Sequence, residues 1–504
     1  MSQLAAGDAR RLDRVFAGGI AWSAGSKAVT QLLSWASVLI AARLLSPNDF
    51  GLAGMAGAFL VVTNVLAEFG IGSAVLQMQE LESDVLSQIH TFACLLCTVI
   101  FFAAEAASPL IASFFKSDRL LPVLLVNNLA FFLTGFQQVP LALLQREMDY
   151  RRISMAEAAS ASVQAVATIA GAVAGLGYWA LIAGLVLGKF TATALNYYWR
   201  PVHFRMPRWN QIAVPIKMGG QIAVSRLAWS GYTQSDGIVV GRVLGAPALG
   251  TYQMALTLAT APAEKISTLI MRAAGPLFAK IQKEEALVRR YFLIILEAMA
   301  LTVLPAMLGL ALVAPDAIAA VLGSKWSAAS APLFWLALFV IVRTASVLCD
   351  QVLVSLRHTR FTMNMSLLNL AVMPAAFLAA SHWGLNVVAA SWLVLSPITI
   401  LPMIVKLARC ANCSFREMTG ALMPALAGSA ALLVAVSIVR EWHSSSAYVR
   451  LAAEILAGAG SYGLVVFGPF RGRIRRYRSF IQSLTVWGRM PILRAIANRA
   501  GRDV

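Results

Sequence analysis

Long apolar runs, separated by short polar segments, recur along nearly the whole chain. A helix needs about 20 apolar residues to cross a hydrocarbon core of about 30 Å, and each run has roughly that length. The pattern predicts an all-α polytopic membrane protein. We expect about 14 transmembrane helices, at residues 18–42, 51–76, 85–111, 120–144, 153–176, 178–199, 212–243, 248–277, 291–314, 331–356, 361–380, 385–407, 418–439 and 448–470.

The polar gaps between the runs divide the chain into five parts. Residues 1–199 hold six predicted spans and form a first lobe, 200–210 are a polar cytoplasmic linker, and 211–410 hold six more spans. Two additional helices occupy 411–470, and 471–504 form a basic tail. The two lobes therefore have equal numbers of predicted spans.

An internal repeat relates the two lobes. The segment 43–51 (Arg-Leu-Leu-Ser-Pro-Asn-Asp-Phe-Gly) resembles 242–250 (Arg-Val-Leu-Gly-Ala-Pro-Ala-Leu-Gly), which lies 199 positions further on. At the same spacing Lys27 matches Arg226. Because each lobe has an even number of spans, both lobes share one orientation, and we expect a parallel pseudo-two-fold repeat about the membrane normal.

The charges of the chain follow membrane orientation. Only 13% of the 504 residues are charged, against roughly 25% in soluble proteins, and the net charge is +18. Most Lys and Arg residues lie in alternate gaps between spans, which predicts cytoplasmic N- and C-termini by the positive-inside rule. A nucleic-acid-binding protein would gather these charges on one soluble face, so no nucleic-acid partner is expected.

Polar side chains line one face of the first and of the seventh predicted span. In the first span they recur at helical spacing: Ser23, Lys27, Thr30 and Ser34. The seventh span repeats the pattern with Arg226, Ser230, Thr233 and Asp236. At the repeat spacing Gln31 matches Ser230, and Ser34 matches Thr233. A charge inside a span is costly unless it faces a bundle interior or water, so the two faces predict a wet cationic cavity between the lobes.

Some charged side chains in the spans have alternative interpretations. Lys27 could instead extend to the cytoplasmic interface. Arg343, near the middle of its span, is a further candidate cation of the cavity, with an ion pair to Asp350 as its alternative. A buried carboxyl group can bind and release a proton, so three carboxylates are candidates for ion coupling: Glu68, Asp236 and Asp350. No role is assigned to three lysines in spans: Lys189, Lys217 and Lys265.

The cysteines and the C-terminal tail carry the remaining chemical signals. The five cysteines include two Cys-x-x-Cys pairs, but neither pair has further Cys or His ligands at the usual spacing, so we expect no metal and no cofactor.

In the tail, apolar residues recur at helical spacing among many Arg residues. This predicts an amphipathic helix on the anionic lipids of the cytoplasmic leaflet, with a solvated, disordered tail as the alternative.

Three motifs give the chain a family resemblance. They are the run 43–51 with Gly70-Ile-Gly72 after it, the segment 144–153 (Leu-Gln-Arg-Glu-Met-Asp-Tyr-Arg-Arg-Ile) that opens a span, and 175–181 (Gly-Leu-Gly-Tyr-Trp-Ala-Leu). Together they resemble the polysaccharide transporter family of Wzx-type lipid-linked oligosaccharide flippases, within the multidrug/oligosaccharidyl-lipid/polysaccharide exporter superfamily. The resemblance covers about residues 10–470.

The resemblance implies a multi-pass protein of the bacterial inner membrane that has no enzymatic activity. It implies that the protein moves undecaprenyl-diphosphate-linked oligosaccharides to the periplasmic leaflet for exopolysaccharide, capsule or O-antigen assembly. Alternating access between two lobes, and polysaccharide polymerase or export machinery as further partners, belong to the same expectation. A diphosphate carries at least two negative charges, so we expect the cavity cations and their polar neighbours to bind it: Lys27, Arg226, Arg343, Gln31, Ser34, Ser230 and Thr233.

Two other functions compete with this interpretation. A drug or cation exporter of the same superfamily is expected to carry carboxylates rather than cations on its central polar faces. A membrane-embedded enzyme, or another component of polysaccharide assembly, is expected to have a sizeable extramembrane domain. The gaps between the predicted spans are too short to form a separately folded domain.

Overall fold

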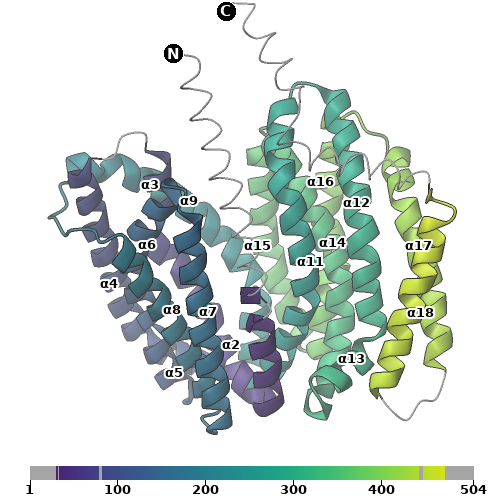
Figure 1. The fold of residues 1–504 in the computed structure, drawn as a ribbon, viewed down its shortest axis with the longest axis horizontal. Coiled ribbons are helices and arrows are strands. Elements are labelled where there is room, and N and C mark those ends of the chain that lie inside the picture. Colours follow the sequence, from purple (N-terminus) through teal and green to yellow (C-terminus); the bar gives the residue numbers. More distant parts are fainter. Residues whose placement is uncertain (1–29, 32, 79–81, 442–446, 472–504) are drawn as a thin grey trace, which may run out of the picture.

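The computed structural model describes residues 30–31, 33–78, 82–441 and 447–471 (Figure 1). Over these residues every regular element is a helix and no strand is present, which confirms the predicted all-α class. The first bundle consists of the helical segment Leu33–Leu44, α2 (Pro47–Glu68), α3 (Ile71–Gln77), α4 (Ser83–Phe114), α5 (Leu120–Asn127), α6 (Leu129–Arg146), α7 (Tyr150–Val173) and α8 (Tyr178–Trp199).

The second bundle and the helices around it follow residue 208. They are α9 (Trp209–Thr233), α10 (Ser235–Val243), α11 (Ala246–Ile281), α12 (Glu285–Leu312), α13 (Ala314–Val321), the short 3-10 helix η1 (Ser324–Ala329), α14 (Ser330–Ser355), α15 (Thr359–Ser381), α16 (Leu385–Cys410), α17 (Phe415–Arg440) and α18 (Ala447–Phe467).

The start of α2 follows from its local sequence. The Ser46 hydroxyl accepts a hydrogen bond from the backbone N–H of Asp49, and the Asp49 carboxylate accepts one from the backbone N–H of Ser46 at 2.9 Å. This reciprocal cap satisfies N–H groups that have no partner inside the helix, and Pro47 at the first position already has a helical φ. The repeat segment 43–51 therefore fixes where α2 begins.

Among the described residues, eleven helices are long and apolar enough to cross a membrane, and the segment Leu33–Leu44 is a shorter apolar helix. The predicted number of fourteen is not confirmed. The predicted span 18–42 lies mostly outside the described residues. The predicted spans 212–243 and 248–277 correspond to α9 with α10 and to α11, which carry charged side chains and are not among the eleven.

Three predicted spans are interrupted in the structure. The span 51–76 breaks between α2 and α3, where Phe69 and Gly70 have left-handed φ angles of 41° and 62°. The span 120–144 breaks at Asn128, and the span 212–243 breaks at Gln234. Irregular backbone at membrane depth is tolerated where it is buried in protein or lines a polar cavity, so these breaks point to regions other than the lipid face.

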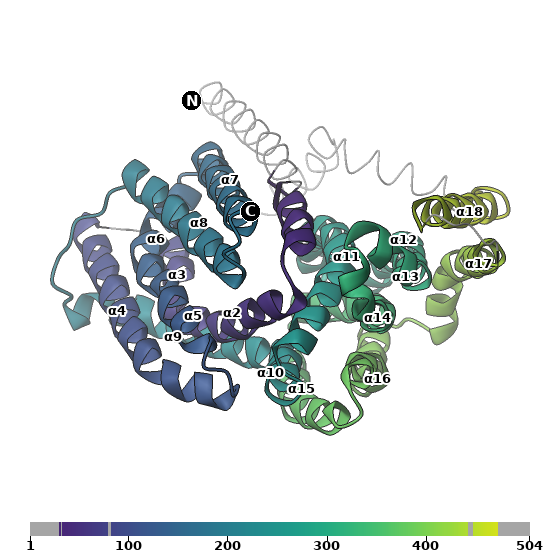
Figure 2. The ribbon, with the colours of Figure 1, turned by 90° about the horizontal axis from the view of Figure 1, so that it is seen from below.

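The two bundles stand side by side and approach each other at the end where α2 begins (Figure 1). Seen from that end, α2 and α11 lie between the two groups of helices (Figure 2). The helix α9, which opens the second lobe in the sequence, packs on α2 and α3 of the first bundle and on α15 of the second. The helices α17 and α18 form a C-terminal pair that packs on α12.

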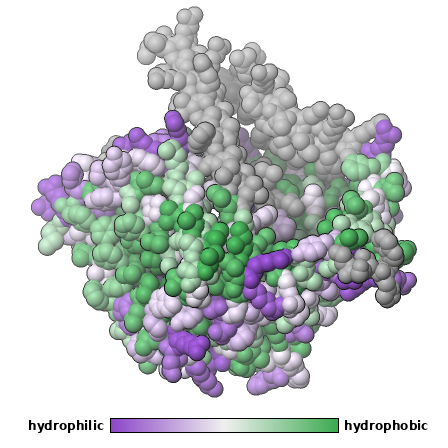
Figure 3. All heavy atoms as spheres, turned by 60° about the horizontal axis from the view of Figure 1, so that its bottom comes forward, coloured by the Kyte–Doolittle hydropathy of each residue, from purple (hydrophilic) through white to green (hydrophobic). Residues whose placement is uncertain are grey.

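The outer surface of the bundles is strongly apolar. Hydrophobic residues gather across the middle of the molecule, and hydrophilic residues lie toward its ends (Figure 3). Large exposed side chains include Phe102, Leu110, Val166 and Leu464. A contiguous apolar surface of this kind would aggregate in water, but it suits contact with acyl chains. The chain is a multi-pass membrane protein.

The bundles meet through a close crossing of α2 and α11. A methyl group on Gly51 would lie 1.8 Å from the carbonyl oxygen of Ala246, and a methyl group on Gly250 would lie 1.8 Å from the carbonyl oxygen of Pro47. Pro47 and Ala246 are themselves 199 positions apart, as are the two glycines. The contact is therefore symmetric with respect to the internal repeat that the sequence predicts.

Hydrogen bonds to main-chain carbonyls extend this contact. The buried Trp326 indole donates to the carbonyl oxygen of Ala42 at 2.8 Å, and the Lys325 ammonium donates to the carbonyl oxygens of Arg43 and Leu45 at 2.6 Å each. In return the Arg43 guanidinium donates to the carbonyl oxygen of Val321 at 2.8 Å. We call the set Arg43, Gly51, Gly250, Lys325 and Trp326 the lobe seam.

Candidate functional site

A polar pocket of about 380 Å³ lies in the first bundle, at the break between α2 and α3. We call it the N-lobe pocket. The helix α2 ends at Glu68, so the break places this carboxylate at the pocket, and α8 and α9 contribute one cation each. Its polar lining residues are Glu68, Ser73, Thr134, Gln137, Gln138, Gln145, Lys189 and Arg226.

The two cations of the N-lobe pocket have different surroundings. The Arg226 guanidinium forms an ion pair with the Glu68 carboxylate at 3.0 Å, and both side chains are about half exposed, at 50% and 49%. Lys189 lines the same pocket from α8, and its ammonium forms no ion pair with a carboxylate of the described residues. An unpaired cation at membrane depth is expensive, so a pocket that accepts an anion next to Lys189 would lower its cost.

A second polar pocket, of about 460 Å³, lies between α11 and α14 of the second bundle. We call it the C-lobe pocket. Arg343 lines it and forms an ion pair with Glu264 at 3.4 Å, rather than with Asp350 as one interpretation of the sequence predicted. The other polar lining residues are Thr260, Ser267, Thr344 and Gln351.

Arg343 also borders a third pocket, of about 280 Å³, which α9 and α15 help to form. Asp350 and Thr233 line this pocket together with Arg343. The Thr233 hydroxyl, however, donates to the carbonyl oxygen of Trp229 at 3.0 Å within its own helix.

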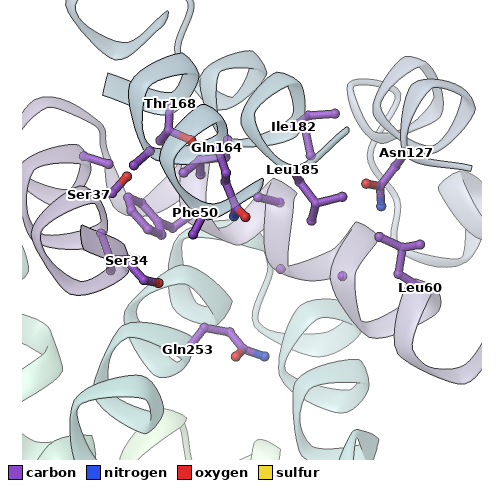
Figure 4. Close-up of a pocket in the computed structure, with 18 residues that line it drawn as sticks. Ser34, Ser37, Phe50, Leu60, Asn127, Gln164, Thr168, Ile182, Leu185 and Gln253 are labelled. Atoms are coloured by element: carbon purple, nitrogen blue, oxygen red, sulfur yellow. The ribbon is translucent and has the colours of Figure 1, made fainter. Parts of the chain in front are cut away.

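A fourth pocket, of about 270 Å³, lies between the bundles next to the lobe seam. Ser34 and Ser37 line it from the segment Leu33–Leu44, and Gln164 and Gln253 approach it from opposite sides (Figure 4). Ser34 lines this pocket, which has no Lys or Arg among its described lining residues, so the cationic cavity expected around Ser34 stays a prediction. The pocket joins residues of the first bundle to one side chain of α11.

Two of the other predicted site residues do not line the described pockets as the helical faces suggested. Lys27 lies outside the described residues. Ser230 is 3% exposed, and Gln31 is half-buried. The residues of the predicted polar face of the seventh span are therefore not together: Arg226 lines the N-lobe pocket, Thr233 lines the third pocket, and Ser230 is buried.

Asp236 is buried and fully hydrogen-bonded. One carboxylate oxygen accepts from the Tyr252 hydroxyl at 2.6 Å and from the Trp392 indole at 3.1 Å, while the other accepts from the backbone N–H of Gly237 at 2.7 Å. A buried carboxylate with three donors stabilises the packing that surrounds it. Asp236 thus connects α10, α11 and α16.

The pairing of α6 with Lys189 was not recognised in the sequence. The predicted span 120–144 carries several amides at helical spacing, and this is an available signal, because amides are uncommon on a lipid-facing helix. The partner lysine lies on a different helix, and only the packing of α6 against α8 brings them to one pocket.

Two cysteines lie at the turn between α16 and α17. The Cys410 sulfur lies 3.1 Å from Nε2 of His358, and burial raises the pKa of the Cys413 thiol to about 11. Among the described residues no three His, Cys, Asp or Glu side chains gather in a metal-binding arrangement.

Comparison with solved structures identifies the fold. The chain is similar to the lipid II flippase MurJ in an inward closed conformation, with a TM-score of 0.71, 12% sequence identity, and coverage of 90% of this chain and 99% of MurJ. It is also similar to an inward-facing multidrug resistance MATE transporter of the MOP superfamily, with a TM-score of 0.61, 12% identity, and coverage of 76% of this chain and 96% of that one. The chain therefore has the fold of these transporters.

Curated relatives carry names from polysaccharide biosynthesis. The lipopolysaccharide biosynthesis protein WzxC of Escherichia coli K12 is 26% identical over 61% of this chain and 63% of WzxC. The succinoglycan biosynthesis transport protein ExoT of Rhizobium meliloti is 26% identical over 61% of this chain and 63% of ExoT. The teichuronic acid biosynthesis protein TuaB of Bacillus subtilis is 27% identical over 56% of this chain and 59% of TuaB.

The matched region thus spans less than two thirds of the length of these relatives. A family model described as polysaccharide biosynthesis protein matches residues 40–331, which is more than half of the chain and includes the repeat segments at 43–51 and 242–250. The family resemblance seen in the sequence motifs is confirmed, and the chain belongs to the polysaccharide biosynthesis protein family.

Proposed function

We propose that this protein is a flippase that carries an oligosaccharide linked to undecaprenyl diphosphate from the cytoplasmic to the periplasmic leaflet. The names of its relatives and its similarity to the fold of a lipid II flippase support a transporter for polysaccharide assembly. The polyprenyl chain of such a substrate stays in lipid, so the protein has to provide a polar environment for the head group alone.

The observation that carries the proposal is the N-lobe pocket, which holds both Lys189 and Arg226. A diphosphate is a compact anion, and an ammonium and a guanidinium in one pocket attract it strongly at low dielectric. The only carboxylate that lines the pocket among the described residues is Glu68, which pairs with Arg226 and is near enough to attract Lys189 without forming an ion pair with it. Among the predicted cations, Arg226 lines the same pocket.

Glu68 and Glu264 act as internal substitutes for the substrate in this proposal. Glu68 pairs with Arg226, and Glu264 pairs with Arg343. A diphosphate competes with each carboxylate for the guanidinium. A bidentate arginine–phosphate contact is geometrically better than a single carboxylate contact at 3.0 Å or 3.4 Å. Substrate binding therefore frees a carboxylate, and a freed carboxylate at membrane depth favours uptake of a proton.

Transport in this proposal proceeds by alternating access, in which the substrate site opens first to one leaflet and then to the other. The bundles are in contact at the lobe seam, which the predicted topology places at the periplasmic side. In this proposal, the closed seam lets the protein accept substrate from the cytoplasmic leaflet. Opening of the seam would then release the head group, with Asp350 and Glu68 as the coupling carboxylates. Asp236, the third coupling candidate from the sequence, stays a candidate, and its carboxylate accepts hydrogen bonds from side chains of α11 and α16.

The division into lobes and the basic tail belong to the same proposal. The two lobes move relative to each other, the tail 471–504 binds anionic lipids of the cytoplasmic leaflet, and a polysaccharide polymerase receives the translocated unit. The bacterial inner membrane is the site of this assembly.

The test is a deletion of the gene followed by analysis of the lipid-linked sugars of the cell. We expect undecaprenyl-diphosphate-linked oligosaccharides to accumulate and surface polysaccharide to disappear. Complementation with Lys189→Gln should not restore the polysaccharide, whereas the matched control Lys116→Gln, an exposed lysine in the turn after α4, should restore it. A deletion strain with normal polysaccharide and no accumulated lipid-linked sugar, but with drug sensitivity, would identify a drug exporter instead.

A further inference from the structure

The polar side chains of α6 form a neutral surface inside the N-lobe pocket. Most of this helix is apolar, yet it presents Thr134, Gln137, Gln138 and Gln145 to the pocket that holds Lys189 and Arg226. We call the three glutamines, Gln137, Gln138 and Gln145, the amide row. None of the four side chains carries a charge, so they add little to the attraction of a phosphate group.

The chemistry of the amide row matches a sugar. Each amide donates and accepts hydrogen bonds, and so does each sugar hydroxyl. From residue 137 to residue 145 the helix rises by about 12 Å, because each residue adds about 1.5 Å. This length allows the row to contact more than one sugar ring in succession.

Gln138 supplies a second, independent observation at this pocket. Its side chain is 8% exposed, and its amide nitrogen donates to the carbonyl oxygen of Ala67 at 2.8 Å. Its amide oxygen is buried and accepts no hydrogen bond from any described residue. Buried acceptors nearly always have a partner, and a donor that enters from the pocket would provide one. A sugar hydroxyl is such a donor, whereas a fully ionised phosphate has no hydrogen to give.

We propose that the amide row of α6 binds the glycan of the substrate, while Lys189 and Arg226 bind its diphosphate. This inference rests on the proposed flippase function and adds a division of the N-lobe pocket into a glycan part and a phosphate part. The amide row then determines which oligosaccharides the protein accepts, and the cations determine that the substrate is a lipid diphosphate. Variants of the two parts should therefore respond differently to probes with and without sugar.

The experiment measures binding of two probes to the purified full chain in lipid nanodiscs. One probe is undecaprenyl diphosphate without sugar, and the other is the undecaprenyl-diphosphate-linked oligosaccharide extracted from cells that lack the gene. For the double variant Gln137→Leu/Gln145→Leu we expect an affinity for the sugar-bearing probe at least tenfold lower, on the order expected for two lost hydrogen bonds, and unchanged affinity for the bare diphosphate. Lys189→Gln should weaken both probes equally.

Controls separate this inference from the proposed function. Gln282→Leu, at the C-terminal end of α11 and outside the pocket, should bind both probes like the wild type. Gln145→Asn keeps an amide and serves if the leucine variant fails to fold, with partial loss for the sugar-bearing probe expected. Equal loss of both probes in the amide-row variants, or no loss of either, overturns the glycan assignment while the flippase proposal stands. A wild-type protein that binds neither probe overturns both.

Discussion

The lobe seam and the N-lobe pocket each contain a lysine, and the two lysines have opposite surroundings. The Lys325 ammonium donates to two main-chain carbonyls across the seam, whereas Lys189 in the pocket has no ion pair with a described residue. At the seam the charge is neutralised by dipoles of the protein itself. In the pocket the charge is left available. We therefore interpret Lys325 as a cation that holds the lobes together, and we propose that Lys189 is a cation that binds a ligand.

The two regions also differ in what they can tolerate. At the seam, backbone meets backbone, so the fit depends on the absence of a side chain at Gly51 and Gly250. In the pocket the side chains are partly exposed and their volume matters less than their charge. We therefore expect the seam to respond to added volume and the pocket to respond to altered charge.

The largest effect is expected for the double substitution Gly51→Ala/Gly250→Ala. Each added methyl would lie 1.8 Å from a carbonyl oxygen of the opposite lobe, so the seam can close only if α2 and α11 move apart. At about 1–3 kcal/mol for each overpacked site, the loss of translocation should reach about 100-fold. The measurement is surface polysaccharide per cell at equal amounts of membrane protein.

Gly57→Ala on the same helix is the matched control for this change. A methyl group there meets no described heavy atom within 4 Å, so translocation should stay at the wild-type level. Equal losses in the control and in the double variant would show that α2 tolerates no alanine, and the loss could not be attributed to the close contacts at the lobe seam.

The second largest effect is expected for Lys189→Gln. Loss of a hydrogen bond to a charged group costs about 1.5–3 kcal/mol, which corresponds to at least about tenfold weaker binding of undecaprenyl diphosphate. Lys189→Arg keeps the charge and should restore most of the affinity. Calorimetric titration of the purified chain measures both. Wild-type affinity of Lys189→Gln would remove this lysine from the site.

A smaller effect is expected for Lys325→Gln. The substitution removes a charged donor from the carbonyl oxygens of Arg43 and Leu45. Because the glutamine amide is still a donor, we expect a net cost of only about 1 kcal/mol, which lowers translocation about fivefold. Binding of undecaprenyl diphosphate should not weaken, because Lys325 does not line the N-lobe pocket. A variant with weaker binding and normal lobe closure would reverse the roles assigned to the two lysines.

The smallest effect, and one of opposite sign, is expected for Glu68→Gln. The neutral amide competes less well than the carboxylate for Arg226, so undecaprenyl diphosphate should bind about twofold more tightly. The gain is small because a half-exposed ion pair contributes little. Weaker binding after this change would mean that Glu68 orients Arg226 for the substrate instead of competing with it.

The apolar runs predicted most of the fold, because the length of a membrane-crossing helix is set by the bilayer. They did not predict the interruptions at Phe69 and Gly70, at Asn128 and at Gln234. A break inside an apolar run has a weak local signal, since its cost is offset by groups that other helices supply. The repeat of the 43–51 segment, by contrast, was visible in the sequence. Both copies form the same symmetric contact, so both need a glycine at the equivalent position.

The candidate site was only partly predictable for a related reason. Helical spacing gives the residues that share a face, but it does not tell which neighbour that face meets. Arg343 pairs with Glu264 on a different helix, although Asp350 is closer in the sequence. Lys189 shares its pocket with residues of α6 and α9, which lie far from it in the sequence.

The reciprocal crossing of Gly51 and Gly250 has a consequence for the origin of the molecule. Each glycine touches the residue that corresponds, in the other half, to the residue touched by its counterpart. A half-length ancestor would have formed this contact as a two-fold homodimer, in which one glycine served both subunits. Any substitution of that glycine would have changed both sides of the interface at once. In a single chain each side can differ, and the two glycines indeed meet different residues, Ala246 and Pro47.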